Sequence, residues 1–487
     1  MITKKILSVC GLFILSMFIL PLTVSANTSD CKVNPDWLTK PFLPDEVKKS
    51  GADGTSTFCD FYQFSTQAFL YLMSPVSKSD NKRNFQVQAN YPILEYNGSG
   101  QPGNSCDTLI EGTTLRTHLA KTIGTGQAGG GATIYAQDGN VIYYDVRFNR
   151  DLCKQTASAV EMQKSNVINF PTKTMELKFA WKPLSKTEIA DNTFVTQEQL
   201  ISGKKVTLGL VGMHIARATK DHPEFVWATY EHKANTPDCL PSNIQDNTNW
   251  TFAGKSCTKN LPDSAAEKNT CKFNQPKSNL VSPTGKPTNI CRVNPYGTAS
   301  GDLKAGENIT DITQQNTQLL KLLGKSGTAK SMKVLSNYFN VGAIWVSDIK
   351  QNSGGIGVPN ERGSLRLANS VAETDYQHVN LTSSFASNCF GCHNYKGTSD
   401  QVSNNITSQS LSHVFRDIKV GQGEAIDITS PTIIGGNAEA SSICAGIKGN
   451  KKKKGVCLNT ASYLKWNGNW TNINTSAGSV CGCELAK

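Results

Sequence analysis

The cysteine content constrains this 487-residue chain more than any other feature. Fifteen cysteines are typical of an oxidising compartment, where thiols pair as disulfides. The N-terminus agrees, because two lysines precede an apolar run that ends at Leu22, and Val24-Ser25-Ala26 supplies the small residues of a signal-peptidase site. We therefore expect a signal peptide over residues 1–26 and a periplasmic or secreted protein without a further membrane span; the alternative is an uncleaved anchor. Cys10 leaves with the signal, and an even number of cysteines remains.

Composition favours a loop-rich β protein with several folding units. Charged residues make up only 18% of the chain, which also contains 40 glycines and 19 prolines, so a coiled coil or a long helical solenoid is excluded. The fold class that we expect is mainly β or α+β, with several domains. The formal net charge is +11, but its one dense cluster, Lys451–Lys454, has no nucleic-acid motif around it. We interpret that cluster as a solvated loop, with contact to an anionic polymer or lipid as the weaker alternative, and expect no nucleic-acid partner.

The first part of the mature chain is predicted to be a disulfide-stapled antiparallel β body. Residues 27 to about 149 are predicted to form short strands and turns, with a hairpin turn at Asp138-Gly139. An amphipathic helix is expected to end near Gly324. The later strands are expected over residues 141–148, 175–182, 205–216 and 225–232, and the last two should pair. A loop-rich insertion over residues 235–302 carries Cys239, Cys257, Cys271 and Cys291, whose pairing the sequence leaves open.

Four regions follow from these patterns and from changes in composition along the chain. Their expected bounds are 1–26 for the signal peptide, 27–345 for the disulfide-rich β body, 346–423 for a linker and a short helical segment that contains Cys389-Phe390-Gly391-Cys392-His393, and 424–487 for a small α+β module.

The sharpest chemical signal is Cys389-Phe390-Gly391-Cys392-His393. At this spacing two thiols can add across the two vinyl groups of haem while the adjacent imidazole reaches the iron. The segment resembles the attachment site of c-type cytochromes. That resemblance implies one covalent haem c held by Cys389 and Cys392, with His393 as the proximal metal ligand. The alternative is a disulfide between the two cysteines beside an uninvolved histidine.

The second axial ligand is less determined. All seven methionines lie at or before Met332, so the downstream thioether ligand of a small cytochrome is missing. His413 is the nearest downstream candidate for the metal, His378 is the upstream one, and Met213 or His214 are distant alternatives; two imidazoles would lower the reduction potential relative to an imidazole and a thioether. About sixty residues give thin cover for a haem. We therefore expect this segment to pack against the β body, through Tyr338-Phe339 and Ile344-Trp345.

Three histidines near the predicted hairpin, His214, His222 and His232, invite a metal interpretation. The hairpin geometry opposes it, because His232 would lie at the far end from the turn. We expect buried or surface histidines, with a role at the haem edge or in proton transfer as the alternative. The stretch Asp221–His232 resembles a signature of uncharacterised bacterial proteins assigned to the cytochrome c family, which implies no activity.

The C-terminal module contains Trp466-Asn467-Gly468-Asn469-Trp470-Thr471, between Gly435–Ala440 and Ser479–Cys483. It resembles the mannan-binding lectin family over residues 424 to about 485. The resemblance implies an antiparallel sheet with one helix, and contacts to mannose-containing glycans from Trp466, Asn467, Gly468, Asn469, Trp470 and Thr471. An aromatic ring can stack on the C–H face of a sugar while amides bind its hydroxyls; the alternative is that both tryptophans are core residues. Cys444, Cys457, Cys481 and Cys483 are candidates for two disulfides.

Together these patterns predict an exported c-type haem protein, with a role in electron transfer or haem-based sensing, that binds mannose-type glycans and exchanges electrons with a redox partner protein. The alternative is a non-haem secreted or adhesive carbohydrate-binding protein in which Cys389 and Cys392 form a disulfide. No hydrolase motif is present in the sequence. An electron carrier and binding protein is therefore favoured over an enzyme, and a redox enzyme that acts on the glycan is a third possibility.

Overall fold

The computed structural model describes most of the β body and parts of the remaining chain. The described residues are 30–77, 82–87, 90–91, 133–152, 168, 170–201, 204–239, 249–258, 261, 271–275, 286–347, 361–374, 388–393, 411–412, 432–434, 464–474 and 478–485. Among them no helix is long and apolar enough to cross a membrane.

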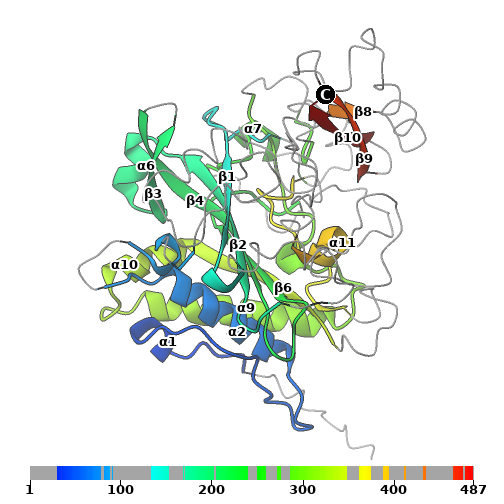
Figure 1. The fold of residues 1–487 in the computed structure, drawn as a ribbon. Coiled ribbons are helices and arrows are strands. Elements are labelled where there is room, and N and C mark those ends of the chain that lie inside the picture. Colours follow the sequence, from blue (N-terminus) through cyan, green and yellow to red (C-terminus); the bar gives the residue numbers. More distant parts are fainter. Residues whose placement is uncertain are drawn as a thin grey trace, which may run out of the picture.

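The centre of the molecule is an antiparallel seven-stranded sheet, which confirms a mainly β body (Figure 1). The strands follow the order β1-β2-β4-β5-β6-β7, and β3 pairs with β4 outside this path. Their bounds are β1 Tyr143–Phe148, β2 Met175–Pro183, β3 Thr196–Ile201, β4 Lys204–Arg217, β5 Val226–His232, β6 Tyr338–Val346 and β7 Glu361–Gly363.

The local sequence signals for the hairpins are confirmed. Strand β4 pairs with β5 in antiparallel register, with His214 opposite Thr229. The turn at Asp138-Gly139 forms as well, since Tyr135 bridges Val141 and Gly139 adopts a φ of 82°, a conformation that glycine reaches without steric cost. Both turns therefore form where polar turn residues separate two extended segments.

The helices lie mainly on one side of the sheet. Their bounds are α1 Asp36–Thr39, α2 Phe58–Met73, α6 Lys186–Asp191, α7 Lys255–Thr258, α9 Ala305–Leu323, α10 Lys330–Lys333 and α11 Cys389–His393, with 3-10 turns η1 Asn84–Gln86, η3 Pro295–Gly297 and η4 Val334–Asn337. Helix α9 confirms the predicted amphipathic helix, and its last residue precedes Gly324.

The prediction of strands and turns for residues 27 to about 149 is wrong at α2. This helix begins with a capping box, in which Thr57 and Asp60 satisfy each other's backbone N–H groups. Nearly all of its residues are buried, so apolar side chains surround it and the 3.6-residue period that reveals a surface helix is lost. Its phenylalanines and tyrosines also have high β propensity, which favoured the wrong interpretation.

Helices α2 and α9 run side by side over one face of the sheet (Figure 1). Together with the sheet residues that face them they form a continuous apolar core, which we call the helix-side core. Phe61 stacks on Trp345 with ring centroids 3.8 Å apart, and Phe69 stacks on Tyr230 at 4.0 Å. Stacked rings contribute about 0.5–1.5 kcal/mol each beyond their buried area, so these pairs fix α2 on the sheet.

Extended segments and the short α11 cover the opposite face. A second group of buried side chains lies there, which we call the aromatic cluster. Its members are Phe148, Leu152, Phe170, Ala216, Ala218, Phe225, Trp227, Val341, Ile344, Val346, Leu365, Leu367, Phe390 and Leu411. Residues 361–374, with β7 at their start, cross this face between α11 and the disulfide-bearing segments.

Within the described residues three disulfides cross-link the chain. They are Cys31–Cys59, Cys239–Cys291 and Cys257–Cys271. The last two pair the four cysteines of the predicted insertion and settle the pairing that the sequence left open. Disulfides of this kind fit an oxidising compartment.

A separate three-stranded antiparallel sheet is formed near the C-terminus, in the order β8-β10-β9 (Figure 1). Its strands are β8 Thr432–Ile434, β9 Leu464–Asn474 and β10 Gly478–Leu485. The helix implied for this module falls outside the described residues.

Candidate functional site

Helix α11 packs its Phe390 into the aromatic cluster. Phe390 is 0% exposed, and its ring meets Trp227 edge-on with centroids 6.0 Å apart. Asn388, at the start of α11, donates to the Glu361 carboxylate at 2.7 Å and to the Leu365 carbonyl at 3.0 Å. Burial of an aromatic side chain and two anchoring hydrogen bonds therefore hold the Cys-x-x-Cys-His segment on the sheet.

The expected packing of this segment against the β body is confirmed. Of the residues predicted to provide the contact, Ile344 belongs to the aromatic cluster and Phe339 packs on it. Tyr338 and Trp345 lie in the helix-side core instead, because successive residues of a strand point to opposite faces.

The imidazole of His393 is oriented by two contacts. Its Nδ1 lies 2.6 Å from the Leu411 carbonyl oxygen, and its ring centroid lies 4.4 Å from that of Trp227. A carbonyl only accepts hydrogen bonds, so Nδ1 carries the hydrogen. Burial lowers the pKa of His393 to about 4, although the hydrogen bond to Leu411 opposes the shift. At neutral pH the ring is therefore uncharged and Nε2 bears the lone pair, the form in which imidazole binds a metal.

Trp227 is itself held by a strained turn. Phe225 adopts a φ of 72°, a region that bulky residues rarely occupy. Its ring stacks on Phe170 at 4.6 Å and meets Trp227 edge-on at 5.5 Å. The indole Nε1 of Trp227 donates to the Glu224 carbonyl at 3.1 Å. The turn therefore fixes the indole that contacts both His393 and Phe390.

Charged side chains lie beneath α11 on the same sheet face. Glu176 and Lys178 of β2 alternate with Leu177, which is in the helix-side core. Glu176 accepts a hydrogen bond of 2.7 Å from the Ser412 hydroxyl. Burial raises the pKa of Glu176 to about 7, although Ser412 and Lys178 oppose the shift.

The carboxylate of Glu373 lies next to Lys178 and pairs with His214. The His214 Nε2 is 3.0 Å from the Glu373 carboxylate, and both side chains are about 15% exposed. Burial works against ionisation of Glu373, but His214 and Lys178 lower its pKa below the ordinary value, as does the Asn369 N–H. After burial and the Leu411 hydrogen bond, Lys178 lowers and Glu373 raises the pKa of His393, so these charged groups lie close enough to act on that ring.

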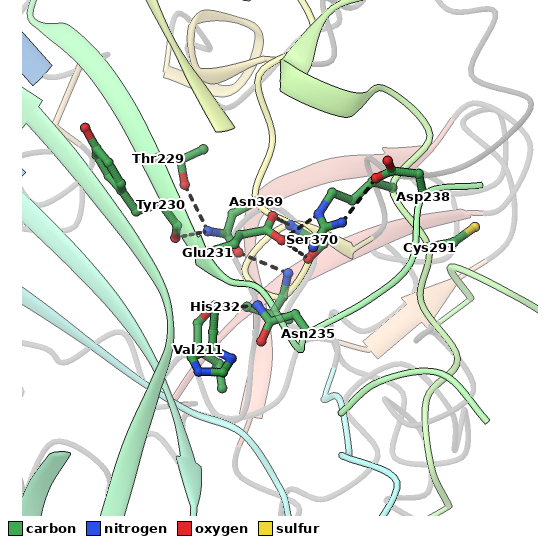
Figure 2. Close-up of polar contacts among 12 residues, drawn as sticks. Val211, Thr229, Tyr230, Glu231, His232, Asn235, Asp238, Cys291, Asn369 and Ser370 are labelled. Carbon is green, nitrogen blue, oxygen red and sulfur yellow. Dashed lines mark hydrogen bonds and ion pairs between the residues drawn. The ribbon is translucent and has the colours of Figure 1, made fainter. Parts of the chain in front are cut away.

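A buried ion pair anchors the segment that carries Glu373 (Figure 2). The Glu231 carboxylate is 0% exposed; it binds the Arg292 Nε at 2.9 Å and accepts from the Ser370 N–H and hydroxyl at 2.6 and 2.7 Å. Arg292 also binds Asp238 at 3.1 Å. Although burial opposes it, these two carboxylates raise the pKa of Arg292. The network thus joins β5, the disulfide-bearing segment and residues 369–370.

The neighbouring Asn369 completes this anchor. Its side-chain amide donates to the Thr229 hydroxyl at 2.9 Å and to the Tyr230 carbonyl at 3.1 Å (Figure 2). Its own N–H donates to Glu373 at 2.9 Å. Glu373 therefore meets His214 at a place that strand β5 determines.

The other two histidines of the hairpin region lie elsewhere. His222 pairs with Glu224 at 3.0 Å and meets Phe61 of α2 edge-on. His232 stacks on Phe194 at 4.1 Å, and burial lowers its pKa to about 4. Only His214 of the three faces α11. Among the described residues no group of three or more metal-ligating side chains occurs.

Several predicted site residues lie outside the described residues or are described only by their backbone. Cys389 is partly exposed at the edge of the aromatic cluster. Cys392 lies in α11, three residues from Cys389, a spacing that places both on one helix face. His413 and His378 lie outside the described residues, as do Cys444 and Cys457.

The tryptophans of the predicted glycan site lie on β9. Trp470 is opposite Cys481 and Trp466 is opposite Cys483 on β10, with a register shift between the two cysteines. The stretch from Trp466 to Thr471, with Asn467, Gly468 and Asn469 between the tryptophans, therefore spans a bulge, and the regular alternation expected for a strand is interrupted there.

No protein-family model, curated protein or solved structure matches the chain. The site is therefore interpreted from its own geometry.

Sequence reasoning missed the residues around α11, namely Trp227, Glu176, Lys178 and Glu373. One signal was present. Glu176 and Lys178 interrupt an otherwise apolar strand, and charged residues within a strand that is covered on both faces need partners. The partners come from distant parts of the chain, so their identity could not be read from sequence.

The Glu231–Arg292 pair should dominate the stability of this face. Replacing Glu231 by Gln leaves a buried guanidinium without its main counter-charge, so we expect a loss of about 3–5 kcal/mol in unfolding free energy. The matched control is Asp238→Asn on the same arginine, where the carboxylate is 20% exposed and the loss should be about 1 kcal/mol or less. Denaturant titration measures both; equal losses would contradict the assigned hierarchy.

Glu176 should make stability depend on pH. Its pKa rises from the ordinary 4.5 to about 7 on folding, so between these values the folded protein holds a proton that the unfolded chain releases. Stability from this group therefore falls as pH rises through that window, by up to about 3 kcal/mol.

The comparison with Glu176→Gln isolates this contribution, because His232 and His393, whose pKa values fall on folding, act in the opposite direction below pH 6.5. Relative to wild type, the variant should gain stability between pH 4.5 and pH 8 in denaturant unfolding. A constant difference across that range would show that Glu176 titrates normally.

Proposed function

We propose that this chain is an exported c-type haem protein in which Cys389 and Cys392 carry the haem and His393 is its proximal ligand. The observation that carries the proposal is the orientation of the His393 ring. Its Nδ1 lies 2.6 Å from the Leu411 carbonyl oxygen, and an outer hydrogen bond of this kind is what orients a metal-ligating histidine.

The residues around α11 fit a haem in two further respects. Cys389 and Cys392 are three residues apart in α11 and His393 follows directly, and each S–H could add across one vinyl double bond to give a thioether without a leaving group. Trp227, Phe390 and Leu411 provide an apolar wall, and such a wall controls dielectric and water access at a redox centre. A bound haem would supply one-electron redox chemistry, which fits electron transfer to a partner protein or redox sensing.

We further propose that the C-terminal module binds mannose-containing glycans through Trp466, Asn467, Gly468, Asn469, Trp470 and Thr471. The supporting observation is the antiparallel arrangement of β8, β10 and β9, with this stretch at an irregular position of β9. A bulge changes the direction of side chains and is common at binding sites. One such module should bind weakly unless several copies assemble.

The haem proposal is tested with the full chain produced together with haem-attachment machinery. The mature polypeptide should gain the mass of one haem and show the α and β absorption bands of a ferrous c-type haem. Cys389→Ala/Cys392→Ala should carry no covalent haem, because both thioethers are lost. The control His222→Ala, which changes a histidine on the α2 side, should keep it. A polypeptide with a Cys389–Cys392 disulfide and no added group would leave the non-haem carbohydrate-binding alternative.

The glycan proposal is tested on the full chain with a panel of oligomannosides. Loss of ring stacking should weaken binding by roughly tenfold for Trp466→Ala or Trp470→Ala. The control is Lys465→Ala, one position before the stretch on the same strand, which should bind as wild type does. Equal binding by all four proteins would place the sugar site elsewhere or remove it.

A further inference from the structure

The distribution of side chains between the two faces of the sheet indicates which residue could be the second ligand of the proposed haem. Four methionines are described, Met73, Met175, Met213 and Met332, and all of them are buried in the helix-side core. Helix α11 lies on the opposite face with the aromatic cluster. Within the described part of the chain, therefore, no thioether faces α11.

His214 lies on the face that α11 covers. Its neighbours in β4, Met213 and Ile215, belong to the helix-side core, while Ala216 belongs to the aromatic cluster with Trp227 and Phe390. The period of two along a strand therefore directs His214 toward the α11 side.

The imidazole of His214 has a carboxylate partner of the kind that metal-ligating histidines have. Its Nε2 lies 3.0 Å from the Glu373 carboxylate, whose ionised form can only accept a hydrogen bond. This contact fixes the orientation of the ring, with Nε2 turned toward the carboxylate. A carboxylate behind a ligating histidine fixes the ring and increases its basicity.

The carboxylate is itself fixed by the rest of the face. Asn369 donates to Glu373 through its N–H and to β5 through its side chain, and the next residue, Ser370, binds the buried Glu231. His393 and His214 are thus two imidazoles from separate elements, each bound at one nitrogen by an acceptor, the Leu411 carbonyl and the Glu373 carboxylate respectively.

From this juxtaposition we propose that His214 would be the second imidazole ligand of a haem held by α11, with Glu373 as its positioning residue. The inference rests on the proposed haem attachment. It assigns to β4 a ligand that is 179 positions before His393 in the sequence, and it makes the β body part of the redox centre. Two imidazole ligands would give a low reduction potential relative to an imidazole and a thioether.

The test compares His214→Ala with the matched variant His413→Ala, both prepared as the full haem-loaded chain. Wild type should show the absorption and electron paramagnetic resonance signals of low-spin iron with two imidazoles. His214→Ala should lose the low-spin signal, and added imidazole should restore it, while His413→Ala should resemble wild type. The readout is iron spin state and coordination, independent of any activity.

Two further variants keep the result interpretable. His214→Met offers a thioether at the same place and should raise the midpoint potential while keeping a low-spin iron. Glu373→Gln should keep the low-spin signal and raise the potential by a smaller amount, because the ring loses its basic partner.

A wild-type chain that carries haem, with an unchanged low-spin signal in His214→Ala, would overturn this inference and leave the haem proposal intact. Loss of the signal in His413→Ala instead would assign the position to His413. A wild-type chain without haem would overturn the proposed function itself, so the two failures are distinguishable.

Discussion

The ion pair between Glu231 and Arg292 is the interaction on which the arrangement of the second sheet face depends. Both groups are buried, and a buried charge is tolerated only when it is paired and hydrogen-bonded. Glu231 satisfies its second oxygen with Ser370, so the segment that follows β7 must lie on the sheet for the charge to be neutralised. Electrostatics thus determines the path of a segment that has little regular secondary structure.

The two faces of the sheet perform different physical tasks. On one face, α2 and α9 bury a continuous apolar core, which accounts for most of the hydrophobic free energy of this region. On the other face, extended segments bring backbone and side-chain polar groups onto the strands, so that Glu176, His214 and Glu373 lie next to aromatic rings. Helices bury the apolar face of a sheet efficiently. A chemical site also needs polar groups that are not used in helical hydrogen bonds, and extended segments provide them.

Local patterns in the sequence predicted what depends on local interactions. The β4–β5 hairpin, α9 with its terminal glycine, and the strands β9 and β10 follow from periodicity and turn residues. Helix α2 was missed, because a helix buried on nearly all sides has no polar face to mark its period. The contacts of His393 with Trp227 and Leu411 were beyond sequence reasoning, since they join residues brought together only by the tertiary fold.

The alternation of side chains along a strand determines which of the adjacent residues Met213 and His214 faces α11. The two residues are adjacent, and the sequence left both open as ligands of a distant iron. A strand sends adjacent side chains to opposite faces, so once α2 is found on the side of Met213, the thioether is buried in the apolar core and the imidazole is left for the face of α11. Our proposal that His214, and not Met213, would face a haem on α11 therefore rests on the topology of the sheet.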